Sequence, residues 1–358
     1  MFKQLRFKIE KRKHVSSLVQ LISLSAAIIL SVLITGLLMY VGKVNIGAGF
    51  IALFDGAFGS WKACVETLLK ATPLILTGLA TVIAFRARIW NIGQESQLYF
   101  GAIMAYLAYT QFIFLPPIIL IPIIILFAII GGAICGFIPA MIKAKFAVDE
   151  IITTIMMNYI VTYFLSLLLS TVWKDPNHYY EQSPTILEKF RFPILLENNR
   201  LHLGFILAII ATVIIFLLIS KTPLGYEIKA MGLNPIAAKF KGINLIKTMV
   251  IVMMISGALS GLAGAGELFG VIFRLKSTIS LGYGYTGIII AMLAGLEPLA
   301  VVPVAILFGG LLNGSFLLQT TTNIPSSLVY VIQAIVLLFF LSARAISNYR
   351  LRIVANDQ

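Results

Sequence analysis

Polar side chains interrupt a chain that is otherwise strongly apolar. The segment RARIWNIGQESQLYFGA carries Asn91, Glu95 and Gln97 between two apolar runs. Asn158 in IMMNYIVTY and Glu267 at the end of SGALSGLAGAGE also lie within or at the end of apolar runs. Such groups are costly in a bilayer, and they usually face protein or a water-filled cavity. We therefore predict that these side chains line a polar pathway for a solute.

Purely structural roles for the first segment stay open. Asn91 could cap the following helix with Ile92 at its first position, and Glu95 would then complement the helix dipole from the first turn. Arg86 and Arg88 lie within reach of these groups and could pair with them. In that case the segment would lock the helix bundle without touching solute.

The other polar groups have similar alternatives. Glu267 precedes Arg274 and Lys276, so it could form an ion pair with Arg274 instead of contacting solute. Asn158 and Asn313 could bind the hydroxyls or base edges of a solute, or they could link neighbouring helices.

The sequence gives no pattern for bond-making chemistry. Cys64 and Cys135 match no metal or disulfide spacing, and His14, His178 and His202 fall in loops or near the ends of apolar runs. We expect no catalytic site, no metal and no cofactor in this chain.

Composition indicates a membrane protein. Of 358 residues, 59% are hydrophobic and 11% are charged, whereas soluble domains have about a quarter charged residues. A spanning helix needs roughly 20 apolar residues, which predicts an all-α polytopic membrane protein forming a single domain over residues 1–358. The ten predicted spans cover residues 18–42, 66–85, 91–110, 117–142, 150–172, 201–220, 246–271, 284–296, 298–318 and 325–343.

The distribution of positive charge orients these spans. The net charge is +13, and a cytoplasmic N-terminus places 18 of the 27 Lys and Arg residues in cytoplasmic segments, including the tail 1–17 and the loop 221–247. The loop 173–200 then lies outside, and both termini lie in the cytoplasm. Spans two to five and seven to ten would begin on opposite sides, as in transporters with two inverted four-helix repeats.

The loop 221–247 contains a predicted surface helix, Pro235–Lys241. Asn234 is suited to its N-cap, Pro235 to its first position and Gly242 to its end. Ile236, Ala237 and Phe240 supply an apolar face, which could lie on lipid or enter a groove in a cytoplasmic protein. The fixed caps favour the groove.

Four ordered segments resemble permease subunits of ABC importers in the ribose/nucleoside branch. They are FRARIWNIGQESQLYFGA, DEIITTIMMNYI, AMGLNPIAAKFKGI and GYGYTGIIIAMLAGLEPLA, and the resemblance covers about residues 60–343. Trp90, Ser96, Glu297 and Ala300 depart from the family pattern. AMGLNPIAAKFKGI is similar to the family's coupling loop, which implies that ATPases dock at Gly232, Asn234, Pro235, Ala238, Phe240 and Gly242.

The resemblance implies a type II importer fold and a nucleoside pathway in a bacterial cell membrane. It also implies two cytoplasmic ATPases that bind ATP and Mg²⁺, a second permease (identical or paralogous), and an extracytoplasmic binding protein or lipoprotein. Three alternatives stay open. They are a permease for a simple sugar such as ribose, a secondary transporter using Glu95 or Glu267 as a proton site, and a membrane scaffold.

Overall fold

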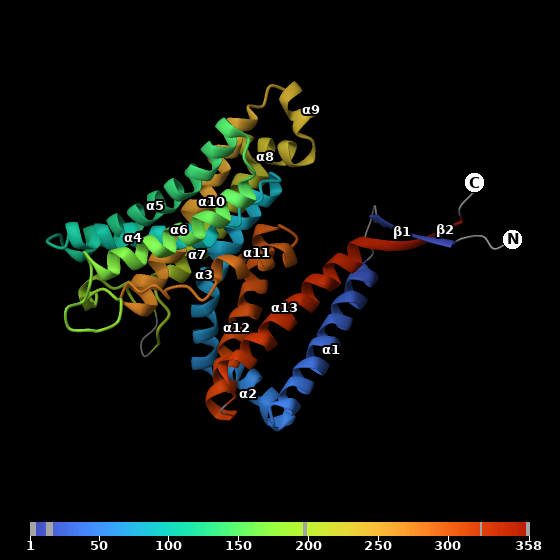
Figure 1. The fold of residues 1–358 in the computed structure, drawn as a ribbon, viewed down its shortest axis with the longest axis horizontal. Coiled ribbons are helices and arrows are strands. Elements are labelled where there is room, and N and C mark those ends of the chain that lie inside the picture. The colour runs from blue at the N-terminus through green and yellow to red at the C-terminus, as the bar shows by residue number, and fades with distance from the viewer. Residues whose placement is uncertain (1–4, 12–16, 196–198, 323, 356–358) are drawn as a thin grey trace. The chain divides into compact units, whose positions relative to one another are not determined.

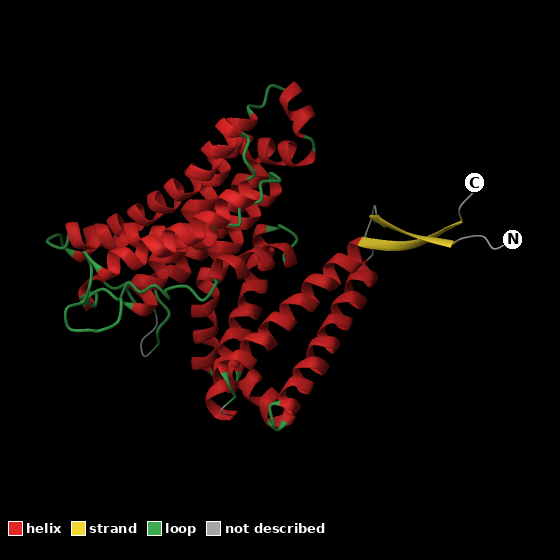
Figure 2. Cartoon of the chain, viewed as in Figure 1, coloured by secondary structure: helices red, strands yellow, loops and turns green. Residues whose placement is uncertain are grey.

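A computed structural model describes residues 5–11, 17–195, 199–322 and 324–355. The predicted tail therefore lies partly outside the described residues, as does His14. Helices dominate the described chain (Figure 2). The long helices are α1 (Ser17–Val41), α3 (Trp61–Arg86), α4 (Gln94–Gln111), α5 (Pro117–Phe146), α6 (Glu150–Ser170), α7 (Leu203–Lys221), α10 (Leu245–Glu267), α12 (Pro298–Thr322) and α13 (Ser326–Asn348). The shorter helices are α2 (Ile46–Phe58), η1 (Glu188–Phe190), α8 (Pro223–Leu233), α9 (Pro235–Phe240), the π-helical turn η2 (Leu268–Ile272) and α11 (Tyr283–Leu293).

Each of the ten predicted spans coincides with one of these helices. Six helices are long and apolar enough to cross a bilayer, and the bent pair formed by α1 and α2 would make a seventh span. α11 is a shorter apolar helix, and α4 falls outside the six because its first turn is polar. The multi-pass membrane architecture is confirmed. α2 was not predicted; it follows α1 after a bend of 120°.

Two short strands depart from the all-α expectation. β1 (Leu5–Lys11) and β2 (Tyr349–Ala355) form an antiparallel pair in which Leu5 lies opposite Ala355 and Lys11 opposite Tyr349 (Figure 1). Paired strands lie only about 4.8 Å apart. The two segments, which are far apart in the sequence, therefore lie side by side.

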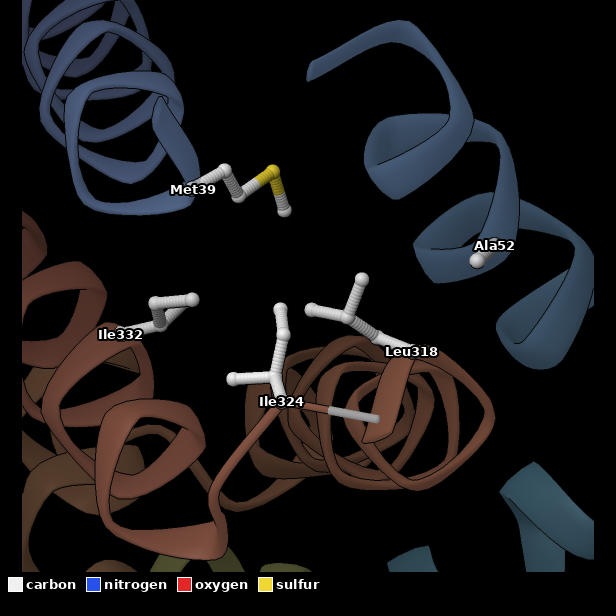
Figure 3. Packing of buried hydrophobic residues seen from close by; sticks show 5 residues of the cluster. All are labelled: Met39, Ala52, Leu318, Ile324 and Ile332. Atoms are coloured by element: carbon white, nitrogen blue, oxygen red, sulfur yellow. The ribbon is translucent and has the colours of Figure 1, made fainter. Parts of the chain in front are cut away.

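The chain, predicted as one domain, divides into two compact units. One comprises Met1–Gly56 with Gly314–Gln358, and the other comprises Ala57–Asn313, so that the boundary falls within α12. In the first unit, buried Met39 and Ala52 pack with Leu318, Ile324 and Ile332 (Figure 3). This apolar cluster joins α1, α2 and the end of α12 to α13.

α10 forms the centre of the second unit, where it packs against α3, α4 and α5 (Figure 1). The glycines of α10 pack directly against the backbone of α4 and α5. A Cβ on Gly257 would collide with the Gly132 carbonyl of α5, and one on Gly264 would collide with the Leu98 carbonyl of α4. Small residues let membrane helices approach closely, and the small-residue face predicted in SGALSGLAGAGE is thus the packing surface of the bundle.

The predicted outer loop packs along the segment after η2. Ser183 N–H donates to Leu275 O, Leu275 N–H donates to Ser183 Oγ, and both distances are 2.9 Å. Ile186 N–H donates to Phe273 O at 2.8 Å. The loop between α6 and α7 is therefore tied to the segment that follows η2.

Candidate solute pathway and docking element

The polar segment forms the junction between α3 and α4. The sequence prediction that Asn91 caps α4 is wrong, because α4 begins at Gln94 and Gly93 is its N-cap. Asn91 Oδ1 accepts from Gly93 N–H at 3.0 Å. This bond forms an Asx-turn, in which the Asn91 side chain accepts from the backbone N–H two residues later. The Asn91 oxygen is therefore used in the turn that precedes α4.

Asn91 and Gln97 bind each other inside the bundle. Asn91 is fully buried, and its Nδ2 donates to Gln97 Oε1 at 3.2 Å and to Ser256 Oγ at 2.9 Å. Gln97 Nε2 donates back to Asn91 Oδ1 at 3.2 Å, and Ser256 Oγ donates to Ala80 O at 2.7 Å. This network joins α3, α4 and α10 and satisfies both amides.

One face of α6 holds the backbone of the junction. Glu150, Thr154 and Asn158 lie four residues apart and therefore line one side of the helix. Trp90 N–H donates to Glu150 Oε1 at 3.2 Å, and Ile92 N–H donates to Thr154 Oγ1 at 3.3 Å. Lys143 forms an ion pair with the same carboxylate of Glu150.

Asn158 completes this face. Its Oδ1 accepts from Ser96 N–H at 2.9 Å, while its Nδ2 donates to Ile92 O at 3.1 Å and to Tyr285 Oη at 3.0 Å. Asn158 thus links α6, the start of α4 and α11. The segments DEIITTIMMNYI and NIGQESQ, which are far apart in sequence, recognise each other through these bonds.

Glu95 binds the start of α11. Its Oε2 accepts from Gly284 N–H at 2.8 Å, and its residue exposure is only 7%. A carboxylate at a helix N-terminus complements the helix dipole. Arg86, considered above as a partner of this polar segment, instead donates from Nε to Leu296 O at 2.7 Å and forms an ion pair with Glu297.

Glu267 lies apart from this network, at the end of α10. The predicted ion pair with Arg274 is wrong, because Arg274 instead contacts Asp175 at 3.9 Å and His178 at 3.4 Å, both in the loop between α6 and α7. Glu267 is buried, and the charges of Lys70 and Arg200 act on it.

The structure brings in residues that sequence analysis did not select. Tyr283 is buried at the start of α11, and the charges of both Glu95 and Glu267 act on it. Lys70 lies within a predicted span, so an ionisable group in an apolar run was the signal that could have found it. Glu150 and Thr154 could have been found from their helical spacing to Asn158.

The predicted surface helix is present as α9. Asn234 Oδ1 accepts from Ile236 N–H at 3.0 Å and from Ala237 N–H at 3.1 Å, which confirms it as the N-cap. Gly242 follows with φ of 84°, a left-handed conformation that suits glycine. The helix ends at Phe240, one residue earlier than predicted, because Lys241 is its C-cap.

The candidate docking residues differ in exposure. Phe240 is 89% exposed and Ile236 is 69% exposed, whereas Ala238 and Gly232 are buried. A Cβ on Gly232 would collide with the Arg86 carbonyl of α3. Gly232 and Ala238 therefore hold α8 and α9 in place, and Ile236 and Phe240 form the exposed apolar surface of α9.

Two hollows adjoin α9. One, of about 620 Å³, is lined by Pro235, Ile236, Lys239, Phe240 and Leu245. The other, of about 370 Å³, extends to the ends of α3 and α5, with Arg88 and Lys143 among its lining residues. A mostly apolar surface with cations at its edge thus lies beside the helix.

Comparison with known proteins places the chain in a family. The sequence model of the family described as "Branched-chain amino acid transport system / permease component" matches residues 63–341. The chain belongs to this permease family. The match includes the α3–α4 junction, α6, α9 and α11, which carry the site described above.

Three relatives resemble the permease over most of its length. It is 37% identical to the guanosine ABC transporter permease protein of Bacillus subtilis, over 89% of this chain and 92% of that protein. It is 34% identical to the nucleoside ABC transporter permease protein of Lactococcus lactis, over 87% and 88% of the two chains. It is 31% identical to the glucose ABC transporter permease protein of Haloferax volcanii, over 86% and 82%.

Substitution of Glu95 separates capping from solute contact in the permease. Glu95→Gln retains an acceptor for Gly284 N–H but removes the charge, whereas Glu95→Ala removes both. We expect Glu95→Gln to lower the melting temperature in detergent only slightly, because the neutral side chain still accepts from Gly284 but no longer complements the helix dipole. Uptake should fall about tenfold, since a hydrogen bond to a charged group contributes about 1.5–3 kcal/mol. Glu95→Ala should lower both quantities.

The control is Glu181→Gln, an equivalent change at an exposed loop position. Normal uptake by Glu95→Gln would assign Glu95 to capping alone.

Proposed function

We propose that this chain is the membrane permease of an ATP-driven importer for nucleosides. The observation that carries this proposal is the match over nearly nine-tenths of the chain to a guanosine permease, and the nucleoside permease of L. lactis supports it. All three relatives are named as ABC transporter permeases. That naming favours an importer over a proton-coupled secondary transporter or a scaffold.

The proposed solute pathway passes the polar layer formed by the α3–α4 junction. Three amide side chains, those of Asn91, Gln97 and Asn158, form hydrogen bonds that link α3, α4, α6, α10 and α11. Glu95 accepts from Gly284 N–H at 2.8 Å and also bonds the Ser280 side chain and the Gly282 backbone, which leaves about one of the roughly four acceptor sites that a carboxylate offers. Glu267 is buried outside this network. We therefore assign direct contact with ribose hydroxyls or base donors to these two acids, and a positioning role to the three amides.

The proposed energy source lies in separate subunits. Ile236 and Phe240 would enter a groove in a cytoplasmic ATPase, as an apolar helix face does in other complexes. ATP and Mg²⁺ would bind to that partner, with no cofactor in this chain. A second permease copy or paralogue and an extracytoplasmic binding protein or lipoprotein complete the assembly, and transport proceeds by alternating access.

The proposed topology has ten spans, both ends in the cytoplasm and two inverted four-helix repeats. The pairing of β1 with β2 supports an even number of crossings, and ten helices lie at the predicted spans. The abundance of Lys and Arg beside α8 and α9 supports a cytoplasmic location for this loop.

A sugar is the second candidate solute. The glucose permease of H. volcanii is 31% identical over 86% of the chain. A nucleoside carries a ribose, so carboxylates and amides that bind hydroxyls serve either solute. Recognition of the base is the property that distinguishes them.

Uptake competition tests the solute. In a deletion strain that expresses the permease with its neighbouring subunits, we expect labelled guanosine to accumulate and unlabelled nucleosides to compete, while glucose and ribose do not. ATP depletion should stop uptake. Competition by glucose alone would establish the sugar permease, and uptake that survives ATP depletion but stops with a protonophore would establish a secondary transporter.

Thiol labelling tests the orientation. Thr185 in the loop 173–200 and Lys239 on α9 are both exposed, so a cysteine at either position is accessible from its own side. In a Cys64→Ser background, an impermeant maleimide should label Thr185→Cys in intact cells and Lys239→Cys only after permeabilisation. The reverse labelling pattern would show that the protein has the opposite orientation in the membrane.

Substitution of Phe240 tests docking. Phe240→Asp should leave folding intact because the side chain is 89% exposed, and it should weaken ATPase binding by about 2 kcal/mol or more, as removal of an aromatic hot spot does. Co-purified ATPase and uptake should both fall more than tenfold. Phe240→Leu is the control, since it keeps the apolar contact; wild-type uptake by Phe240→Asp would contradict the docking role.

A further inference from the structure

Arg86, the last residue of α3, contacts two separate elements, the turn between α11 and α12 and the helix α8. Its Nε donates to Leu296 O at 2.7 Å, and its Nη2 forms an ion pair with Glu297 in the turn between α11 and α12. Its own carbonyl packs so closely on Gly232 of α8 that only glycine fits there. Its chain then continues directly into the polar junction.

The contact with Gly232 leads to α9, the candidate docking helix. Gly232 is buried one residue before the end of α8, and Asn234 is both the C-cap of α8 and the N-cap of α9. No flexible linker separates the two helices. A displacement of α9 is therefore passed through α8 to the end of α3.

The contact with the Leu296–Glu297 turn leads to the candidate solute site. Arg86 holds the C-terminal turn of α11, where Gly295 and Leu296 have φ of 73° and 60°. Glu95 holds the other end of α11 at Gly284 N–H. α11 has 11 residues and is about 16 Å long, so it joins Arg86 to Glu95 as a rigid rod.

The guanidinium geometry is specific. Its planar fork of N–H donors can bind a carbonyl and a carboxylate together, which the single ammonium of Lys cannot reproduce. The Arg86 side chain is 15% exposed and that of Glu297 is 64% exposed. The cation is thus largely desolvated, and loss of its partner leaves it uncompensated.

We propose that Arg86 is a positioning residue that couples the docking helix α9 to the solute site at Glu95, through Gly232 on one side and the Leu296–Glu297 turn with α11 on the other. The proposal rests on the proposed importer function. It adds a route by which movement at the ATPase surface reaches the buried carboxylate of Glu95. It also gives a role to Glu297, one of the residues that depart from the family pattern.

The experiment uses the complete transporter in proteoliposomes, with its ATPases and its binding protein. The readout is solute taken up per ATP hydrolysed, measured beside the melting temperature of each complex. The variants are Arg86→Gln, Arg86→Lys, Glu297→Gln and the Arg86→Gln/Glu297→Gln double variant. Lys145→Ala, which removes an exposed cation near the end of α5, is the matched control.

We expect Arg86→Gln to lower uptake per ATP by about tenfold while ATP hydrolysis continues, with a smaller loss in Arg86→Lys and Glu297→Gln. The double variant should resemble Arg86→Gln, because residues in direct contact are non-additive. Lys145→Ala should match the wild type.

Unchanged uptake per ATP with a lowered melting temperature would reduce Arg86 to a structural contact and overturn the proposal. If the Arg86→Gln complex fails to assemble, Arg86→Lys and Glu297→Gln test the proposal in its place. Wild-type uptake per ATP in both of these variants would overturn the proposal. A wild-type complex without ATP-driven uptake would overturn the importer function itself, and this inference with it.

Discussion

The fold depends on hydrogen bonds between polar groups inside the helix bundle, where lipid offers no hydrogen-bond partners. The junction between α3 and α4 lies inside the bundle, and its polar groups depend on partners in the protein. Gln94 Oε1 is buried without one among the described residues, whereas other groups of the segment find theirs on neighbouring helices. Thr81 of α3, Asn158 of α6, Ser256 of α10 and Gly284 of α11 supply them. Because these partners come from distant parts of the chain, this short segment fixes the relative positions of four helices.

Close helix packing brings the partners within reach. α10 can lie directly against α4 and α5 only because Gly257, Gly261 and Gly264 present no side chain to their backbones. The same approach places Ser256 within 2.9 Å of Asn91. In a bilayer, where apolar side chains gain little from leaving lipid, such packing and the bonds it permits drive helix association.

Close packing and capping also fix α9 at the surface of the protein. α9 is short, and as an isolated helix it would have marginal stability. In the protein, Asn234 caps α9, its residue Ala238 is buried, and Gly232 packs the preceding helix α8 against α3. Ile236 and Phe240 are left exposed on this rigid base. The exposed surface of α9 is thus built from few residues, and Gly232 connects its base to Arg86, where α3 leads into the polar junction.

The amino-acid sequence by itself determined the membrane class, the location of the ten long or apolar helices and the capped surface helix. These features depend on local composition, hydrophobic length and cap chemistry. It also identified the polar segment and the small-residue face of α10. It did not determine which groups pair: Arg86 binds Glu297, Arg274 binds Asp175 and His178, and Glu95 binds α11.

Only the tertiary structure decided these partners, as well as the pairing of β1 with β2 and the bend between α1 and α2. A side chain in a membrane helix bundle bonds to whatever the packing brings within about 3 Å. Most of these contacts join residues that are far apart in the sequence, where a local pattern carries no information about distance.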